Sequence, residues 1–245
     1  MITWYFGLPS SSSHALIGGL IGAGLIAGGP KALVPIGIEK VVAFMVLSPV
    51  LGFVAALALT IGVMYYFRNT LAEKINKVFG KLQIVSSTFF SLTHGANDGQ
   101  KTMGVITALL IAGGILPHSS SHGSFIVPVP VILASATAIG LGTFFGGWRI
   151  VKTMAFKLTP LKPFQGFCAE TAGGSILSGM AILGIPVSTT HSIAGAIMGT
   201  GASKRFSAVR WSMGRRIVYA WIITIPASAS VAALALILIN LIGLR

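Results

Sequence analysis

Two short runs of hydroxyl-bearing residues follow prolines at distant places in the chain. Pro9 precedes Ser10–Ser13 and His14, and Pro186 precedes Val187, Ser188–Thr190 and His191. We call residues 9–14 and 186–191 the tips. At a helix start, hydroxyls and free backbone N–H groups meet the positive end of the helix dipole and suit a small anion. Ordinary N-capping is the alternative for each tip alone. The residues expected to bind the anion are Ser11, Ser12, Ser13, Ser188, Thr189 and Thr190.

A polar segment, Thr93–Lys101, interrupts an apolar stretch that runs from Leu82 to Gly114. Its Asp98 is one of only four acidic residues in the chain, and carboxylates inside apolar spans are costly and usually functional. We predict a broken helix here, in which Asn97 and Asp98 bind a cation together with backbone carbonyls. The alternatives are an ion pair between Asp98 and Lys101, or a cap for a helix that starts near Gly99.

Other polar residues lie close to these motifs. Glu170 is predicted to be a further cation ligand, with a buried ion pair or a helix N-terminal role as alternatives. Gln100 is expected to contact the anion, and Lys101 to contact the anion or its counter-charge, with an interfacial Lys as the alternative. Histidines can relay protons, but hydrogen bonds that orient their neighbours are the favoured role. These supporting histidines are His14, His94 and His191.

The composition is that of a membrane protein. Of the 245 residues, 54% are hydrophobic and 9% are charged, and the mean hydropathy is +0.89. Soluble domains carry about 25% charged residues. The net charge of +13 would otherwise suggest nucleic acid, but Lys and Arg cluster between apolar spans, as the positive-inside rule requires. We therefore expect an all-α protein that crosses the lipid bilayer several times and binds no nucleic acid.

The stretch from Cys168 to Ala202 contains two apolar runs joined by Gly184-Ile185-Pro186. Each run is about 15 residues, or about 22 Å of helix, and a bilayer core is about 30 Å thick. Gly, Ala, Ser and Thr are frequent in both runs, which favours burial among other helices over lipid contact. We predict a re-entrant helical hairpin over residues 164–202 that enters and leaves on one side of the membrane.

Full-length spans are predicted at residues 41–67, 126–148 and 217–244. The loops 68–81, 149–162 and 204–216 each carry at least four Lys or Arg residues and are expected to be cytoplasmic. The loop 115–125 carries none and is expected on the outer side.

An internal repeat relates the two ends of the chain. Pro9 matches Pro186, Pro49 matches Pro226, and Val54–Leu59 recurs as Val231–Leu236, all at one constant offset in residue number. The span 41–67 ends at a basic loop, whereas its counterpart 217–244 follows one. This indicates an inverted-topology repeat, the architecture of many secondary transporters. We assign residues 1–67 to the first repeat, 68–81 to a cytoplasmic linker and 82–245 to the second repeat.

The repeat also predicts residues upstream of Met1. His94 precedes His191 by 97 residues, so its counterpart before His14 would lie about 80 residues before the first residue of this chain. We expect a missing N-terminal segment or a companion protein to supply that half of the cation site.

With these motifs the chain resembles the inorganic phosphate transporter (PiT) family. The resemblance rests on His94-Gly-Ala-Asn-Asp98 followed by Gly-Gln-Lys-Thr-Met, on Pro186-Val-Ser-Thr-Thr-His191, and on Pro9-Ser-Ser-Ser-Ser-His14. It implies symport of inorganic phosphate with H⁺ or Na⁺ by alternating access, in the inner membrane. It also implies phosphate binding by the tip hydroxyls, and a role for Asn97 and Asp98 at the cation. No other cofactor or metal is expected, and assembly into a homo-oligomer stays open.

Four other functions remain alternatives. The first is a permease of the same family for sulfate or another oxyanion. The second is a passive channel, although channels usually repeat around a pore axis. The third is an intramembrane enzyme, which the sequence disfavours because it offers neither a metal triad nor an activated serine. The fourth is a truncated remnant that transports nothing.

Overall fold

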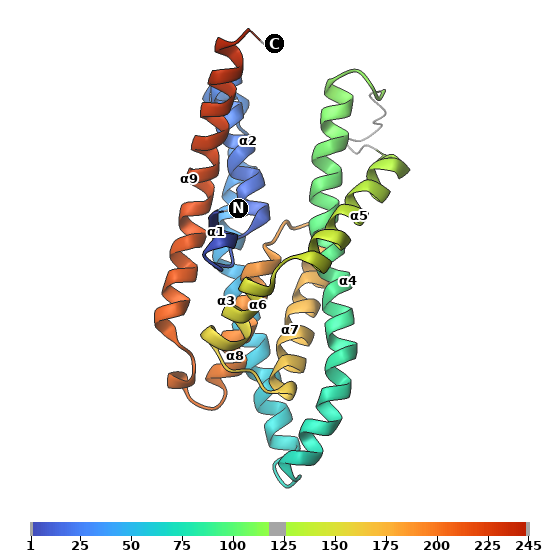
Figure 1. Ribbon diagram of the computed structural model, residues 1–245, viewed down its shortest axis with the longest axis vertical. Coiled ribbons are helices and arrows are strands. Elements are labelled where there is room, and N and C mark those ends of the chain that lie inside the picture. The colour runs from blue at the N-terminus through green and yellow to red at the C-terminus, as the bar shows by residue number, and fades with distance from the viewer. Residues whose placement is uncertain (1, 118–125, 244–245) are drawn as a thin grey trace.

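The computed structural model describes residues 2–117 and 126–243, and every regular element in these two ranges is helical (Figure 1). The prediction of an all-helical chain is therefore confirmed for this part. Most of the predicted outer loop 115–125 lies outside the described residues. In chain order the elements are α1 (Ile2–Tyr5), α2 (Ser12–Gly28), η1 (Pro30–Ala32), α3 (Pro35–Tyr66), α4 (Ala72–Ala112), α5 (Val129–Phe145), α6 (Trp148–Lys152), η2 (Thr153–Leu158), α7 (Pro163–Ile182), α8 (Thr189–Ala202), η3 (Phe206–Ala208) and α9 (Trp211–Leu241).

Two helices among the described residues are long and apolar enough to cross a bilayer alone. They are α3, with 32 residues, and α9, with 31. A third candidate is α5 together with Trp148–Leu158, which are bent by 56° relative to each other. The bend falls at Gly146 and Gly147, where the left-handed φ of 92° at Gly147 favours glycine. These three elements correspond to the three predicted full-length spans.

The residues of the predicted hairpin form two helices, α7 and α8, which pack against each other. Eleven of the 14 residues of α8 are buried, so this helix lies among other helices, as its small residues led us to expect. Its length of about 21 Å is too short to cross about 30 Å of hydrocarbon. α7 has 20 residues and is longer than the predicted first arm.

α2 packs along α9, and α8 packs along α3, with glycines at both contacts. A Cβ at Gly22 would lie 2.0 Å from the carbonyl oxygen of Ala229, and a Cβ at Gly199 would lie 2.2 Å from that of Phe53. Only glycine permits so close an approach of two backbones. Gly22 and Gly199 are related by the same offset as the two tips, so the two ends of the chain form matching helix pairs.

Each pair is parallel, and the two pairs run in opposite directions. Gly18 faces Ile225 and Gly22 faces Ala229, so residue numbers rise together along α2 and α9. Figure 1 shows α2 and α8 starting near the middle of the molecule and extending toward opposite ends. The tips, which include the first residues of these two helices, therefore lie near mid-height.

Two predictions about α4 are wrong. The helix is continuous from Ala72 to Ala112, so it is not broken at Thr93–Lys101, and it includes residues 72–81, which were predicted as part of a loop. The polar groups are satisfied without unwinding, because Asn97 and Asp98 find side-chain and carbonyl partners while the helix keeps its own backbone hydrogen bonds. At about 60 Å, α4 is longer than a bilayer core is thick.

Candidate functional site

The two tips have the same local structure. Ser11 caps α2 by accepting a hydrogen bond from the backbone N–H of His14 at 3.2 Å, and Ser188 caps α8 by accepting from that of His191 at 3.3 Å. Both serines are buried. The ring centroids of His14 and His191 are 4.6 Å apart, so the starts of the two helices meet. Two segments that lie far apart in the sequence thus form one junction.

The long helices α3 and α9 contact this junction and hold His191 in place. The ring of His191 stacks on Trp221 of α9 with centroids 3.7 Å apart, and the indole N–H of Trp221 donates to the carbonyl of Pro9 at 2.9 Å. His191 Nδ1 lies 3.2 Å from the carbonyl oxygen of Met45 in α3. Pro49 has no N–H, so the Met45 carbonyl lacks its usual helical donor and is free for the histidine. His191 is thereby held between α3 and α9.

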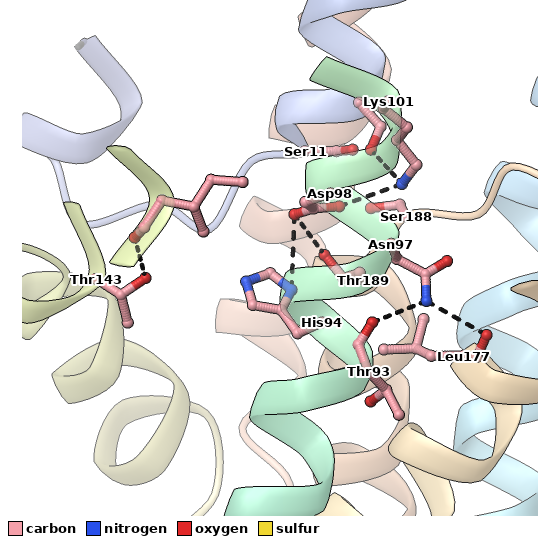
Figure 2. Close-up of polar contacts among 12 residues, drawn as sticks. Ser11, Thr93, His94, Asn97, Asp98, Lys101, Thr143, Leu177, Ser188 and Thr189 are labelled. Carbon is pink, nitrogen blue, oxygen red and sulfur yellow. Dashed lines mark hydrogen bonds and ion pairs between the residues drawn. The ribbon is translucent and has the colours of Figure 1, made fainter. Parts of the chain in front are cut away.

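α4 brings charge to the same junction. The carboxylate of Asp98 accepts from Thr189 Oγ1 at 3.2 Å and pairs with Lys101 Nζ at 3.2 Å, while His94 Nδ1 lies 3.6 Å away (Figure 2). The ion pair between Asp98 and Lys101, which the sequence left as an alternative, is therefore present. Lys101 Nζ also donates to Ser13 Oγ at 2.8 Å and to the carbonyl of Val187 at 2.7 Å.

A pocket of about 290 Å³ opens beside this cluster. It is lined by residues of α2, α4 and α5: Ser12, Ser13, Leu16, Asp98, Lys101, Thr102 and Ile139. The lining of this pocket therefore combines neutral hydroxyls, one ammonium group, one carboxylate and the first turn of α2. Such a set can hold a small anion by hydrogen bonds and partly balance its charge.

Besides Ser11 and Ser188, whose hydroxyls cap the two helices, four predicted site residues lie outside the cluster or use their polar groups elsewhere. Asn97 Nδ2 donates to Thr93 O at 2.9 Å and to Leu177 O at 3.4 Å, which joins α4 to α7 (Figure 2). Glu170 accepts a 2.5 Å hydrogen bond from Ser86, and Ser86 precedes Asp98 by 12 residues, about 18 Å along α4. Gln100 is exposed, and Thr190 is partly buried beside Thr189 without lining the pocket.

Several members of the site escaped the sequence analysis. Thr102, Leu16 and Ile139 line the pocket, and the backbone carbonyl of Val187 contacts Lys101. Thr102 could have been found, because it stands four residues after Asp98 and so shares its helix face. A backbone carbonyl and two apolar residues carry no signal in a single sequence.

Comparisons with known proteins agree on one family. The model of the Phosphate transporter family matches residues 1–232. A relative from Rhizobium meliloti (strain 1021), named a probable low-affinity inorganic phosphate transporter, is 50% identical over 99% of this chain and 71% of its own length. A relative of the same name from Bacillus subtilis (strain 168) is 42% identical over 99% of this chain and 71% of its own length.

A solved structure described as the sodium-dependent phosphate transporter has the same fold. It superposes with a TM-score of 0.81 at 23% identity, over 98% of this chain and 76% of that chain. The matching family is one of membrane transporters and not of enzymes, and the solved structure shares the fold of this chain. The chain belongs to the phosphate transporter family.

Proposed function

We propose that this protein carries inorganic phosphate across the inner membrane by symport with a cation, through alternating access. The observation that carries the proposal is the meeting of both tips with Asp98 and Lys101 beside one pocket. Phosphate is the substrate of choice within the class because the chain belongs to a phosphate transporter family. The permease for sulfate or another oxyanion is the alternative that the experiment below separates.

The chemistry of the pocket suits reversible binding of phosphate. Ser12 and Ser13 offer hydroxyls at the start of α2, where unpaired backbone N–H groups and the helix dipole also favour an anion. Thr189 offers the equivalent hydroxyl at the start of α8. Lys101 supplies the positive charge in the pocket wall, and its pairing with Asp98 moderates the attraction. A moderate attraction lets the anion leave again, which transport requires.

Charge explains why a cation must move with the anion. Carrying one negative charge inward against 100 mV costs about 2.3 kcal/mol, and phosphate near neutral pH carries one or two charges. A co-transported H⁺ or Na⁺ offsets that cost and drives accumulation. Asp98 is the acidic residue at the pocket and is therefore our candidate for the coupling step. No other cofactor enters this proposal.

The two helix pairs are suited to alternating access. We assign α2 and α3 to a first inverted repeat over residues 1–67. The second repeat, over residues 82–245, takes α4 from residue 82 onward and α5 to α9, with α7 and α8 as a re-entrant hairpin. Each short helix packs on the long helix of the other repeat through glycines. Rocking one pair against the other would expose the tips to one side of the membrane at a time.

The proposal is tested by uptake of radioactive phosphate into proteoliposomes that hold the purified protein. Wild type should accumulate phosphate above equilibrium, and an uncoupler or removal of the driving cation should abolish this. Excess arsenate should compete, whereas excess sulfate should not. A passive channel would equilibrate phosphate but would not accumulate it.

Asp98→Asn is the decisive variant. Glu39→Gln is its matched control, because Glu39 is an exposed acidic residue of α3 that does not line the pocket. Asp98→Asn should insert in the membrane and lose accumulation, while Glu39→Gln should behave as wild type. Accumulation at the wild-type level by Asp98→Asn, or equal competition by sulfate, would refute the assignment.

A further inference from the structure

The ammonium group of Lys101 has three oxygen atoms as hydrogen-bond acceptors. This group lies 2.7 Å from the carbonyl oxygen of Val187, 2.8 Å from Ser13 Oγ and 3.2 Å from Asp98 Oδ1. An ammonium group has three N–H donors, and here each donor has one acceptor. The three acceptors come from three parts of the chain: the turn before α8, the first turn of α2, and α4. Lys101 thereby joins both tips to α4.

The same oxygens would suit a free cation. A carboxylate, a hydroxyl and a backbone carbonyl near a helix start are the ligands that small hard cations take in proteins and transporters. The side chains of Asp98 and Lys101 are only 18% and 19% exposed, so little solvent screens their charges. A sodium ion at this point would share these oxygens with the ammonium group of Lys101, and the two cations would repel each other.

We propose that the ammonium group of Lys101 is the built-in cation of this site, and that it takes the position of a free sodium ion between the tips and Asp98. This inference rests on the proposed function and narrows it: phosphate binding and uptake by this protein need no sodium. Coupling then falls to the proton. The side chain also becomes a specificity determinant, because removing it uncovers an oxygen-lined site for a monovalent cation.

The test compares the purified protein in sodium chloride and in choline chloride at equal ionic strength. Wild type should bind and accumulate phosphate equally in both media. Lys101→Ala should bind phosphate about tenfold more weakly in choline, because the carboxylate of Asp98 then lacks its partner beside the anion. Sodium should restore part of this binding and should raise the temperature at which Lys101→Ala unfolds, without changing that of wild type.

Lys31→Ala is the matched control, because Lys31 is exposed on η1 and its removal changes the net charge equally. This variant should show no response to sodium. A rise in phosphate binding by wild type with sodium would overturn the inference, and so would a Lys101→Ala variant that behaves identically in both salts. If Lys101→Ala does not fold, the comparison of wild type in the two salts still decides.

Failure of the proposed function gives a different result. In that case wild type would bind and accumulate no phosphate in either salt. The thermal response of Lys101→Ala to sodium would still report on the cation site, because that measurement needs no phosphate.

Discussion

Adding one methyl group at a glycine contact between helices should destabilise the protein strongly. In Gly22→Ala the new Cβ would lie 2.0 Å from the carbonyl oxygen of Ala229, and in Gly199→Ala it would lie 2.2 Å from that of Phe53. Ordinary contacts begin near 3.4 Å, so each pair of helices would have to part by about 1.3 Å. Because the obstacle is backbone, no side chain can rotate away, and the cost should lie at the upper end of overpacking, about 3 kcal/mol.

Thermal unfolding of the purified protein in detergent measures this cost. On the scale of soluble domains of this size, about 3 kcal/mol lowers the midpoint by about 6–12 °C. Gly62→Ala is the control, since Gly62 is an exposed residue of α3 and its Cβ would meet no atom within 4 Å. That change should be neutral or stabilise the protein by about 0.5–1 kcal/mol, because alanine is the better helix former.

The two glycine variants also test whether the helix pairs are equivalent. If Gly22→Ala and Gly199→Ala both unfold at the wild-type temperature, the close backbone contacts do not exist in the protein. If only one is destabilised, the two pairs do not match, and the reasoning from the internal repeat fails. Loss of phosphate uptake should accompany the loss of stability, because α2 and α8 begin at the tips.

Two further variants probe how the site is held in place. Trp221→Phe keeps an aromatic ring beside His191 but loses the hydrogen bond to the carbonyl of Pro9. It should lower the free energy of unfolding by about 1 kcal/mol and weaken phosphate binding. Trp148→Phe, at an exposed position, should change neither quantity. Glu170→Ala removes the hydrogen bond from Ser86 to α7, although Ser86 keeps the carbonyl of Gln83 as an acceptor, so the change should cost about 1 kcal/mol. Glu73→Ala, exposed at the start of α4, should cost less than about 0.5 kcal/mol, and equal stabilities would show that Glu170 does not join α7 to α4.

The sequence predicted the parts of the fold that depend on local pattern. Apolar length identified α3 and α9, and proline followed by Ser and Thr located the starts of α2 and α8. The constant offset of the internal repeat predicted two equivalent tips, and both tips have a serine cap of the same kind. Gly18 and Gly22 match Gly195 and Gly199 at the same offset, so these glycines are visible in the sequence. The helices that pack against these glycines could not be predicted, because a contact between two helices depends on the surfaces of both.

The unwound segment in α4 was predicted wrongly for a physical reason. Polar residues in an apolar stretch can mean an open backbone, or they can mean side chains that pair within an intact helix. Asp98 and Lys101 are three residues apart, and Asn97 reaches the carbonyl of Thr93 four residues earlier, so an intact helix satisfies them. Because successive residues of an intact helix point in different directions, Asn97 contacts α7 whereas Asp98 contacts the start of α8. Nothing in the sequence placed Glu170 beside Ser86 rather than Asp98.

Binding of inorganic phosphate to the purified protein tests the central claim most directly, namely that both tips hold one anion. Ser12→Ala and Thr189→Val each remove one hydroxyl at the junction, and each should raise the dissociation constant about tenfold. The double variant should raise it by about a hundredfold or more, while Thr143→Val, whose hydroxyl bonds within α5, should leave it unchanged. Wild-type affinity in the double variant would show that phosphate binds elsewhere.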